Sequence, residues 1–79
     1  MKNAIKVINS NLIEFTFYHK GVPSWTSETW ERQSCERFKC VHSEASNYNF
    51  DADGKIKDND DMVRYIKKWN ATDCEIKFY

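Results

Sequence analysis

The sequence predicts a small α+β domain, a two-layer sandwich in which two helices cover one face of an antiparallel sheet. The chain has 79 residues, which is enough for one domain, spanning 1–79, and too few for two. Its apolar residues are mostly β-branched or aromatic, with Leu12 as the single leucine, and such residues favour strands. Some stretches alternate with a period of two and one has the spacing of a helix buried on one side. The predicted order is β-β-α-β-β-α-β.

The first two strands are predicted at residues 3–9 and 12–20, joined as a β-hairpin by a short Asn-rich turn. In the second segment Ile13, Phe15 and Phe17 share one face and polar side chains occupy much of the other. This alternation is typical of a strand with one buried face.

The next segment, residues 27–41, is predicted to form a helix. Glu28, Arg32 and Glu36 are four residues apart, and opposite charges at this spacing stabilise helices. A strand over 37–42 stays open as the alternative, because the side chains there also fit a period of two.

The second half of the chain is predicted to form a hairpin, a helix and a closing strand. A hairpin is expected within 48–56, because Asp53 and Gly54 form a turn dipeptide between short alternating runs. Residues 60–70 have apolar residues at helical spacing, acidic residues in the first turn and lysines in the last. Residues 74–79 alternate again and are predicted to form a strand.

Composition excludes several classes of protein. Twelve basic and twelve acidic residues give zero formal net charge, which argues against a strongly basic nucleic-acid clamp. No stretch approaches the roughly 18–20 uncharged apolar residues of a membrane span, so no membrane association is expected. The three cysteines form no disulfide-dense pattern and the N-terminal residues do not resemble a signal peptide, so we expect a cytoplasmic protein.

Residues 49–60 resemble the twelve-residue calcium loop of an EF-hand, with oxygen-bearing side chains at positions 1, 3, 5 and 12 and Gly54 at position 6. The match departs from the pattern at Asn49, Lys57 and Asp60, which occupy positions 1, 9 and 12. We interpret the segment as a turn followed by a helix cap, and a weak divalent-ion site is the third hypothesis for function.

A zinc site would need four ligands, and the chain offers Cys35, Cys40, His42 and Cys74. Their spacing is unusual for zinc ligands, so the cysteines are interpreted as small buried apolar residues. Neither a metal ligand nor a cofactor is therefore assigned.

No catalytic residue is assigned either, and the chain is not expected to be an enzyme. It has only two glycines and no phosphate-binding loop, and a domain of this size has little room for a closed pocket. A small nucleic-acid-binding domain is the alternative function, because aromatic and basic residues occur together in the first forty residues. A homodimer is also possible, since small domains often gain stability by association.

The preferred hypothesis is a non-enzymatic protein-binding module that inhibits a partner protein. Its size, neutrality and Lys/Asn-rich composition are typical of phage or mobile-element proteins of the anti-defence, anti-CRISPR, antitoxin or immunity type. Aromatic residues and arginine are enriched at interface hot spots, and an acidic loop could face a basic partner. The predicted partner-binding residues are Tyr18, Trp25, Trp30, Arg32, Asp51 and Asp53.

Overall fold

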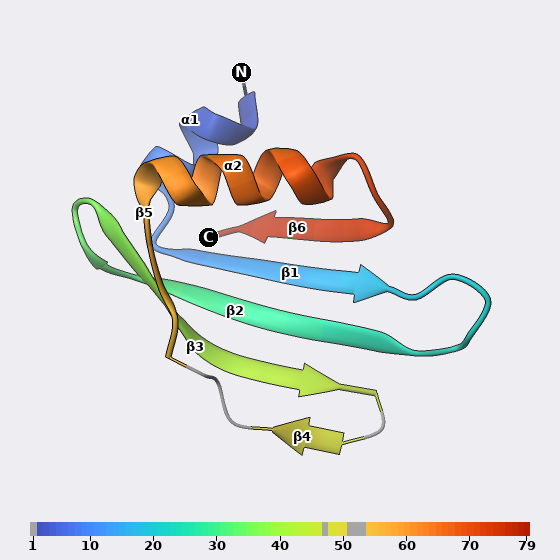
Figure 1. The fold of residues 1–79 in the computed structure, drawn as a ribbon. Helices are drawn as coiled ribbons and strands as arrows, with labels where there is room; N and C mark the ends of the chain where they lie inside the picture. Colours follow the sequence, from blue (N-terminus) through green and yellow to red (C-terminus); the bar gives the residue numbers. More distant parts are fainter. Residues whose placement is uncertain (1, 47, 51–53) are drawn as a thin grey trace.

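Six strands form one antiparallel sheet, and two helices lie together on one side of it (Figure 1). This computed structural model describes residues 2–46, 48–50 and 54–79. The elements in chain order are α1 (Lys2–Asn9), β1 (Leu12–Tyr18), β2 (Trp25–Ser34), β3 (Arg37–Ala45), β4 (Tyr48–Phe50), β5 (Ile56–Asp58), α2 (Asn59–Asn70) and β6 (Cys74–Phe78). The predicted α+β class, with an antiparallel sheet and two helices, is confirmed, although the order differs.

The strands run side by side in the order β4-β3-β2-β1-β6, with β5 paired to β3 as well. β3 pairs with β2 along one edge, and its other edge is shared by β4 at residues 43–45 and β5 at 37–39. The central strands β1 and β2 are matched residue for residue from Leu12↔Glu31 to Tyr18↔Trp25. This register decides which side chains lie next to each other on each face.

The prediction of a strand at residues 3–9 is wrong, because this segment is helix α1. Val7 is fully buried, while Ile5 and Ile8 remain 58% exposed, so only one side of the segment meets the core. The helix packs against α2, and this contact between segments far apart in the sequence provides the apolar surface that a short helix needs.

The prediction of a helix at 27–41 is also wrong. The segment forms the hairpin of β2 and β3, and the strand that stayed open as the alternative at 37–42 is correct and extends to Ala45. β2 buries only Trp30 completely, but it lies between β1 and β3 and pairs with both. Pairing on both edges therefore stabilises a strand whose side chains are mostly polar.

The predicted strand at 12–20, the helix at 60–70 and the strand at 74–79 are confirmed as β1, α2 and β6. The side chain of Asp58 caps α2 by accepting a hydrogen bond from the Asp61 backbone N–H at 2.8 Å. The prediction of a hairpin within 48–56 is wrong, because among the described residues β4 and β5 each pair with β3 and not with each other. The turn residue Asp53 lies outside the described residues.

The core lies between the sheet and the helices. Phe15 and Phe17 of β1 contact aromatic rings of α2, with ring centroids 5.0 Å from Tyr65 and 4.7 Å from Trp69 respectively. The buried apolar residues of the core are Val7, Ile13, Phe15, Trp30, Phe38, Cys40, Met62 and Ile66. Within the described part of the chain, no helix is long and apolar enough to cross a membrane.

Candidate binding surface

The helices cover one face of the sheet and leave the opposite face exposed. Because side chains alternate along a strand, the residues that alternate with the core positions of β1, β2, β3 and β6 share this second face. We call it the open face, and its members are Leu12, Glu14, Thr16, Tyr18, Trp25, Ser27, Thr29, Glu31, Arg37, Lys39, His42, Glu44, Glu75, Lys77 and Tyr79. Each of them is at least partly exposed.

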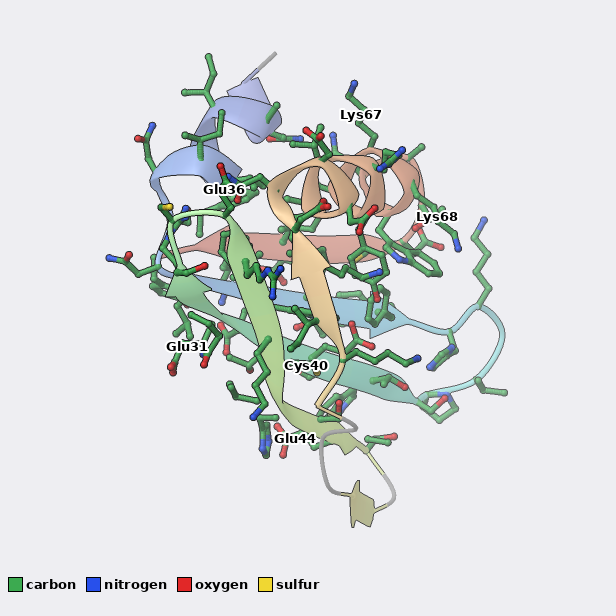
Figure 2. All side chains as sticks on the ribbon, turned by 60° about the vertical axis from the view of Figure 1, so that its left-hand side comes forward. Glu31, Glu36, Cys40, Glu44, Lys67 and Lys68 are labelled. Carbon is green, nitrogen blue, oxygen red and sulfur yellow. The ribbon has the colours of Figure 1, made fainter. Side chains whose placement is uncertain are left out.

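The open face is acidic. It has four glutamates against two lysines and one arginine, and its other titratable groups are His42 and two tyrosines. Figure 2 shows Glu31 and Glu44 on the side of the sheet away from α2, whereas Lys67 and Lys68 project from α2 itself.

Two aromatic residues lie side by side at one end of the open face. Tyr18 and Trp25 are directly opposite in the β1–β2 register, and Tyr18 is 50% exposed. The Tyr18 hydroxyl donates a hydrogen bond of 3.1 Å to Glu75 Oε2, and this bond is the main reason that the Tyr18 pKa is raised. The phenol thus lies beside a carboxylate.

A second tyrosine has the same arrangement at the other end of the open face. Tyr79 pairs through its backbone with Leu12, and its hydroxyl donates a 3.0 Å hydrogen bond to Glu14 Oε1. This bond raises the Tyr79 pKa as well. The glutamates therefore fix the orientation of both phenols and keep carboxylate oxygens at the surface.

A shallow cavity of about 290 Å³ lies next to the Tyr18–Trp25 pair, and its remaining lining residues are Thr16, Ser27 and Glu44. The pairing places four residues in one row across four strands, in the order Glu75, Thr16, Ser27, Glu44. Two hydroxyl-bearing residues thus lie between two carboxylate-bearing residues, beside two aromatic residues.

Trp30, predicted as a partner-binding residue, lies in the core instead and is 2% exposed. It is on the helix-facing side of β2, where its indole N–H donates a 3.1 Å hydrogen bond to Glu28 Oε1. The prediction placed it on a helix. In a strand, Trp30 falls on the opposite face from Trp25, which is five residues away, so the two cannot form one surface.

Arg32 is not part of the open face either. It lies on the same side of β2 as Trp30, and its guanidinium is 4.7 Å from the ring centroid of Phe38. It donates hydrogen bonds to the backbone carbonyls of Val7, Ile8, Ser10, Ser34 and Cys35. Arg32 therefore joins the end of α1 to the β2–β3 hairpin.

Of the predicted surface, the structure brings together Tyr18 and Trp25. Asp51 and Asp53 lie outside the described residues. The glutamates of the open face were missed, although the alternation that identified the core side of β1 also places Glu14 on the opposite side. Tyr79 was assigned to the closing strand but not to a surface.

A further polar group that the sequence did not reveal joins α2 to the sheet. Tyr65 of α2 donates a 2.6 Å hydrogen bond to Glu28 Oε1, the same oxygen that accepts from Trp30. Burial, followed by this hydrogen bond, raises the pKa of Tyr65 well above its usual range. The Lys57 ammonium lies 4.7 Å from the centroid of the Tyr65 ring, where it makes a cation–π contact.

The residues considered for a zinc site lie apart. Cys35 is exposed in the β2–β3 turn, Cys40 is buried on the helix-facing side and His42 lies on the open face. The described residues include no group of three or more His, Cys, Asp and Glu side chains that could hold a metal ion. Much of the EF-hand-like segment, including Asp51 and Asp53, lies outside them.

No protein-family model matches this chain, and no curated protein and no solved structure matches it either. The open face, with its paired aromatic residues and its excess of carboxylates, is therefore the feature from which a function can be argued.

Proposed function

We propose that this chain is a non-enzymatic protein-binding module that uses the open face to bind a basic surface of another protein. The observation that supports this proposal is the combination of exposed aromatic and acidic side chains on one uncovered sheet face. An antiparallel sheet often leaves one face in water, but that face is then expected to be simply polar. Tyrosine and tryptophan are instead enriched in protein interfaces, where they provide much of the affinity.

The charge of the open face favours a basic protein surface over a nucleic acid. Aromatic residues can stack on bases, but nucleic-acid sites place them among lysines and arginines that neutralise phosphates. Here Tyr18 and Trp25 lie next to Glu44 and Glu75, whose carboxylates would repel a phosphate backbone. Lys77, 3.7 Å from Glu75, offsets part of this negative charge. Lys67 and Lys68 belong to α2 and not to the open face.

Binding in this mode would inhibit a partner by covering its basic surface. Many basic protein surfaces act by attracting nucleic acids or other anions, so an acidic domain bound there blocks access to them. This action fits the anti-defence or immunity type of protein and a cytoplasmic location, both of which we retain as part of the proposal.

The experiment is affinity capture with the tagged chain from its native cell or host, with and without nuclease. Captured proteins are identified by mass spectrometry, and the leading partner is then purified for calorimetric titration. We expect one stoichiometric partner whose recovery is insensitive to nuclease. Trp25→Ala should weaken its binding about tenfold or more, as is typical of an interface anchor.

The matched control is Ile5→Ala, which removes a 58% exposed apolar side chain from α1 on the other side of the molecule. It should leave the affinity unchanged. Equal affinities for wild type and Trp25→Ala, or nuclease-sensitive recovery, would contradict the proposal.

A further inference from the structure

The cavity beside Tyr18 and Trp25 has an unusual combination of groups for its small size. Thr16 and Ser27 are directly opposite each other in the β1–β2 register, and Ser27 is directly opposite Glu44 in the β2–β3 register. Tyr18 and Trp25, which pair with each other, line the same cavity. A ligand that enters it therefore meets aromatic rings, a carboxylate and hydroxyl groups together.

These groups match the chemistry of a guanidinium. Its planar cation stacks on aromatic faces, and its fork of N–H donors binds a carboxylate with two hydrogen bonds. The hydroxyls of Thr16 and Ser27 are acceptors for the remaining donors. A lysine ammonium is a compact, strongly hydrated charge without a planar face, so it should fit the same groups less well.

The basic side chains already near this cavity leave Glu44 and the neighbouring Glu75 accessible. Glu44 Oε2 is 3.6 Å from His42 Nε2, and Glu75 Oε1 is 3.7 Å from Lys77 Nζ. The four side chains are 36–57% exposed, so both contacts are screened by water and exchange readily with a new partner. The other Glu75 oxygen accepts from the Tyr18 hydroxyl and thereby holds the phenol ring beside the cavity.

We propose that this cavity is an arginine seat, in which Trp25, Tyr18 and Glu44 bind a single arginine side chain of the partner protein. This inference rests on the proposed function, because it assigns the specificity of the same open face. The excess of carboxylates on the open face attracts the basic surface, and the seat selects arginine within it. We therefore expect the partner surface to place an arginine side chain in the cavity beside Tyr18 and Trp25.

The probe is a capped pentapeptide, Lys-Gly-Arg-Gly-Lys, compared with two peptides in which citrulline or lysine replaces the central arginine. Citrulline has nearly the same shape as arginine but no charge. Binding is followed by two-dimensional NMR of the ¹⁵N-labelled protein, in which the chain's three tryptophans should give three separate indole N–H signals. Trp25→Phe identifies the signal of Trp25 by its disappearance.

We expect the arginine peptide to shift the Trp25 indole signal in a saturable manner and to leave the signal of the buried Trp30 unchanged. The citrulline peptide should bind about fivefold more weakly, which corresponds to a cation–π contact at a partly exposed site, and the lysine peptide should lie between them. Equal affinity for the arginine and citrulline peptides would contradict the proposal of an arginine seat.

Glu44→Gln and Glu31→Gln form a matched pair of variants. Both glutamates lie on the open face, but Glu31 is four residues along β2 from Ser27, about 13 Å at the usual strand rise. Glu44→Gln should remove the preference for arginine over citrulline, whereas Glu31→Gln should retain it. Loss of the preference in both variants to the same extent would show that general charge, and not the seat, selects the peptide.

The failure of the seat can be distinguished from the failure of the proposed function. If all three peptides bind equally and Trp25→Ala still weakens binding of the captured partner, the open face remains the proposed binding surface and the arginine seat is wrong. If no peptide shifts the Trp25 signal and the captured partner binds Trp25→Ala with wild-type affinity, the arginine seat and the proposed function are both wrong.

Discussion

Arg32 provides the sharpest test of how the fold is held together. Its guanidinium donates hydrogen bonds to five backbone carbonyls, three near the C-terminal end of α1 and two in the β2–β3 turn. The bonds to Ser10 at 2.9 Å and Val7 at 3.0 Å are partly buried, and the other three are exposed. A cation at this end also interacts favourably with the helix dipole.

The change is Arg32→Ala, and its cost follows from the two partly buried bonds. A hydrogen bond from a charged group contributes about 1.5–3 kcal/mol, whereas exposed carbonyls exchange their partner for water at little cost. Two bonds at the lower figure give a loss of about 3 kcal/mol in the free energy of unfolding. That is a large fraction of the total stability of about 5–15 kcal/mol that is usual for a domain.

The assay is urea unfolding followed by tryptophan fluorescence, together with amide hydrogen exchange in α1. Arg32→Lys should lower the free energy of unfolding by about half as much as Arg32→Ala, because lysine keeps the charge but has no planar fork of donors. The control is Arg64→Ala on α2, where the ion pair with Asp61 is formed by an arginine side chain that is 74% exposed. This control should cost less than about 0.5 kcal/mol. A similarly small loss for Arg32→Ala, with unchanged exchange in α1, would refute the reasoning.

Three further predictions concern the contact of α2 with the sheet, alkaline pH and the open face. Tyr65→Phe removes one of the two hydrogen bonds to Glu28 and should lower the free energy of unfolding, measured in urea, by about 1–2 kcal/mol. An unchanged free energy of unfolding would show that water replaces the hydroxyl. Burial raises the pKa of Cys74 from 9.0 to about 11. The unfolded chain therefore releases this proton first, so stability should fall as pH rises from 9 toward 11, and Cys74→Ala should flatten that part of a pH series of urea midpoints. Trp25→Ala should change the free energy of unfolding by less than about 1 kcal/mol while it weakens partner binding, and a variant that fails to fold would instead place Trp25 in the core.

The elements predicted correctly from the sequence are those whose own side chains carry the pattern. β1 alternates apolar and polar residues, and α2 has a buried stripe with Met62 and Ile66 and acidic and basic residues at the appropriate ends. These patterns reflect local geometry, so they are visible without knowledge of what the element packs against.

The elements predicted wrongly are stabilised by contacts that one segment of sequence does not contain. α1 has eight residues and is stable because α2 and the Arg32 guanidinium contact it. β2 is held by backbone pairing on both edges, while the spacing of Glu28, Arg32 and Glu36 imitates the charge pattern of a helix.

The error in secondary structure explains the error in the predicted surface. Because residues 25–34 form a strand, their side chains alternate between the two faces of the sheet. Trp25 therefore lies on the open face, and Trp30 and Arg32 lie on the opposite face. Tyr18 and Trp25 became neighbours only through the register of β1 with β2, and the acidic side chains of the open face come from four different strands. Such a juxtaposition depends on strand order, which sequence patterns do not determine.

The most direct test of the proposed function compares charge reversal on the two sides of the molecule. Glu31→Lys with Glu44→Lys reverses two charges on the open face, and Lys67→Glu with Lys68→Glu reverses two on α2, all four being visible in Figure 2. The measurement is the dissociation constant of each double variant with the purified partner, after circular dichroism has verified folding. We expect the open-face variant to lose affinity about 100-fold or more and the α2 variant to remain within about threefold of wild type. Unchanged binding by the open-face variant together with loss of binding by the α2 variant would contradict the assignment of the open face as the binding surface.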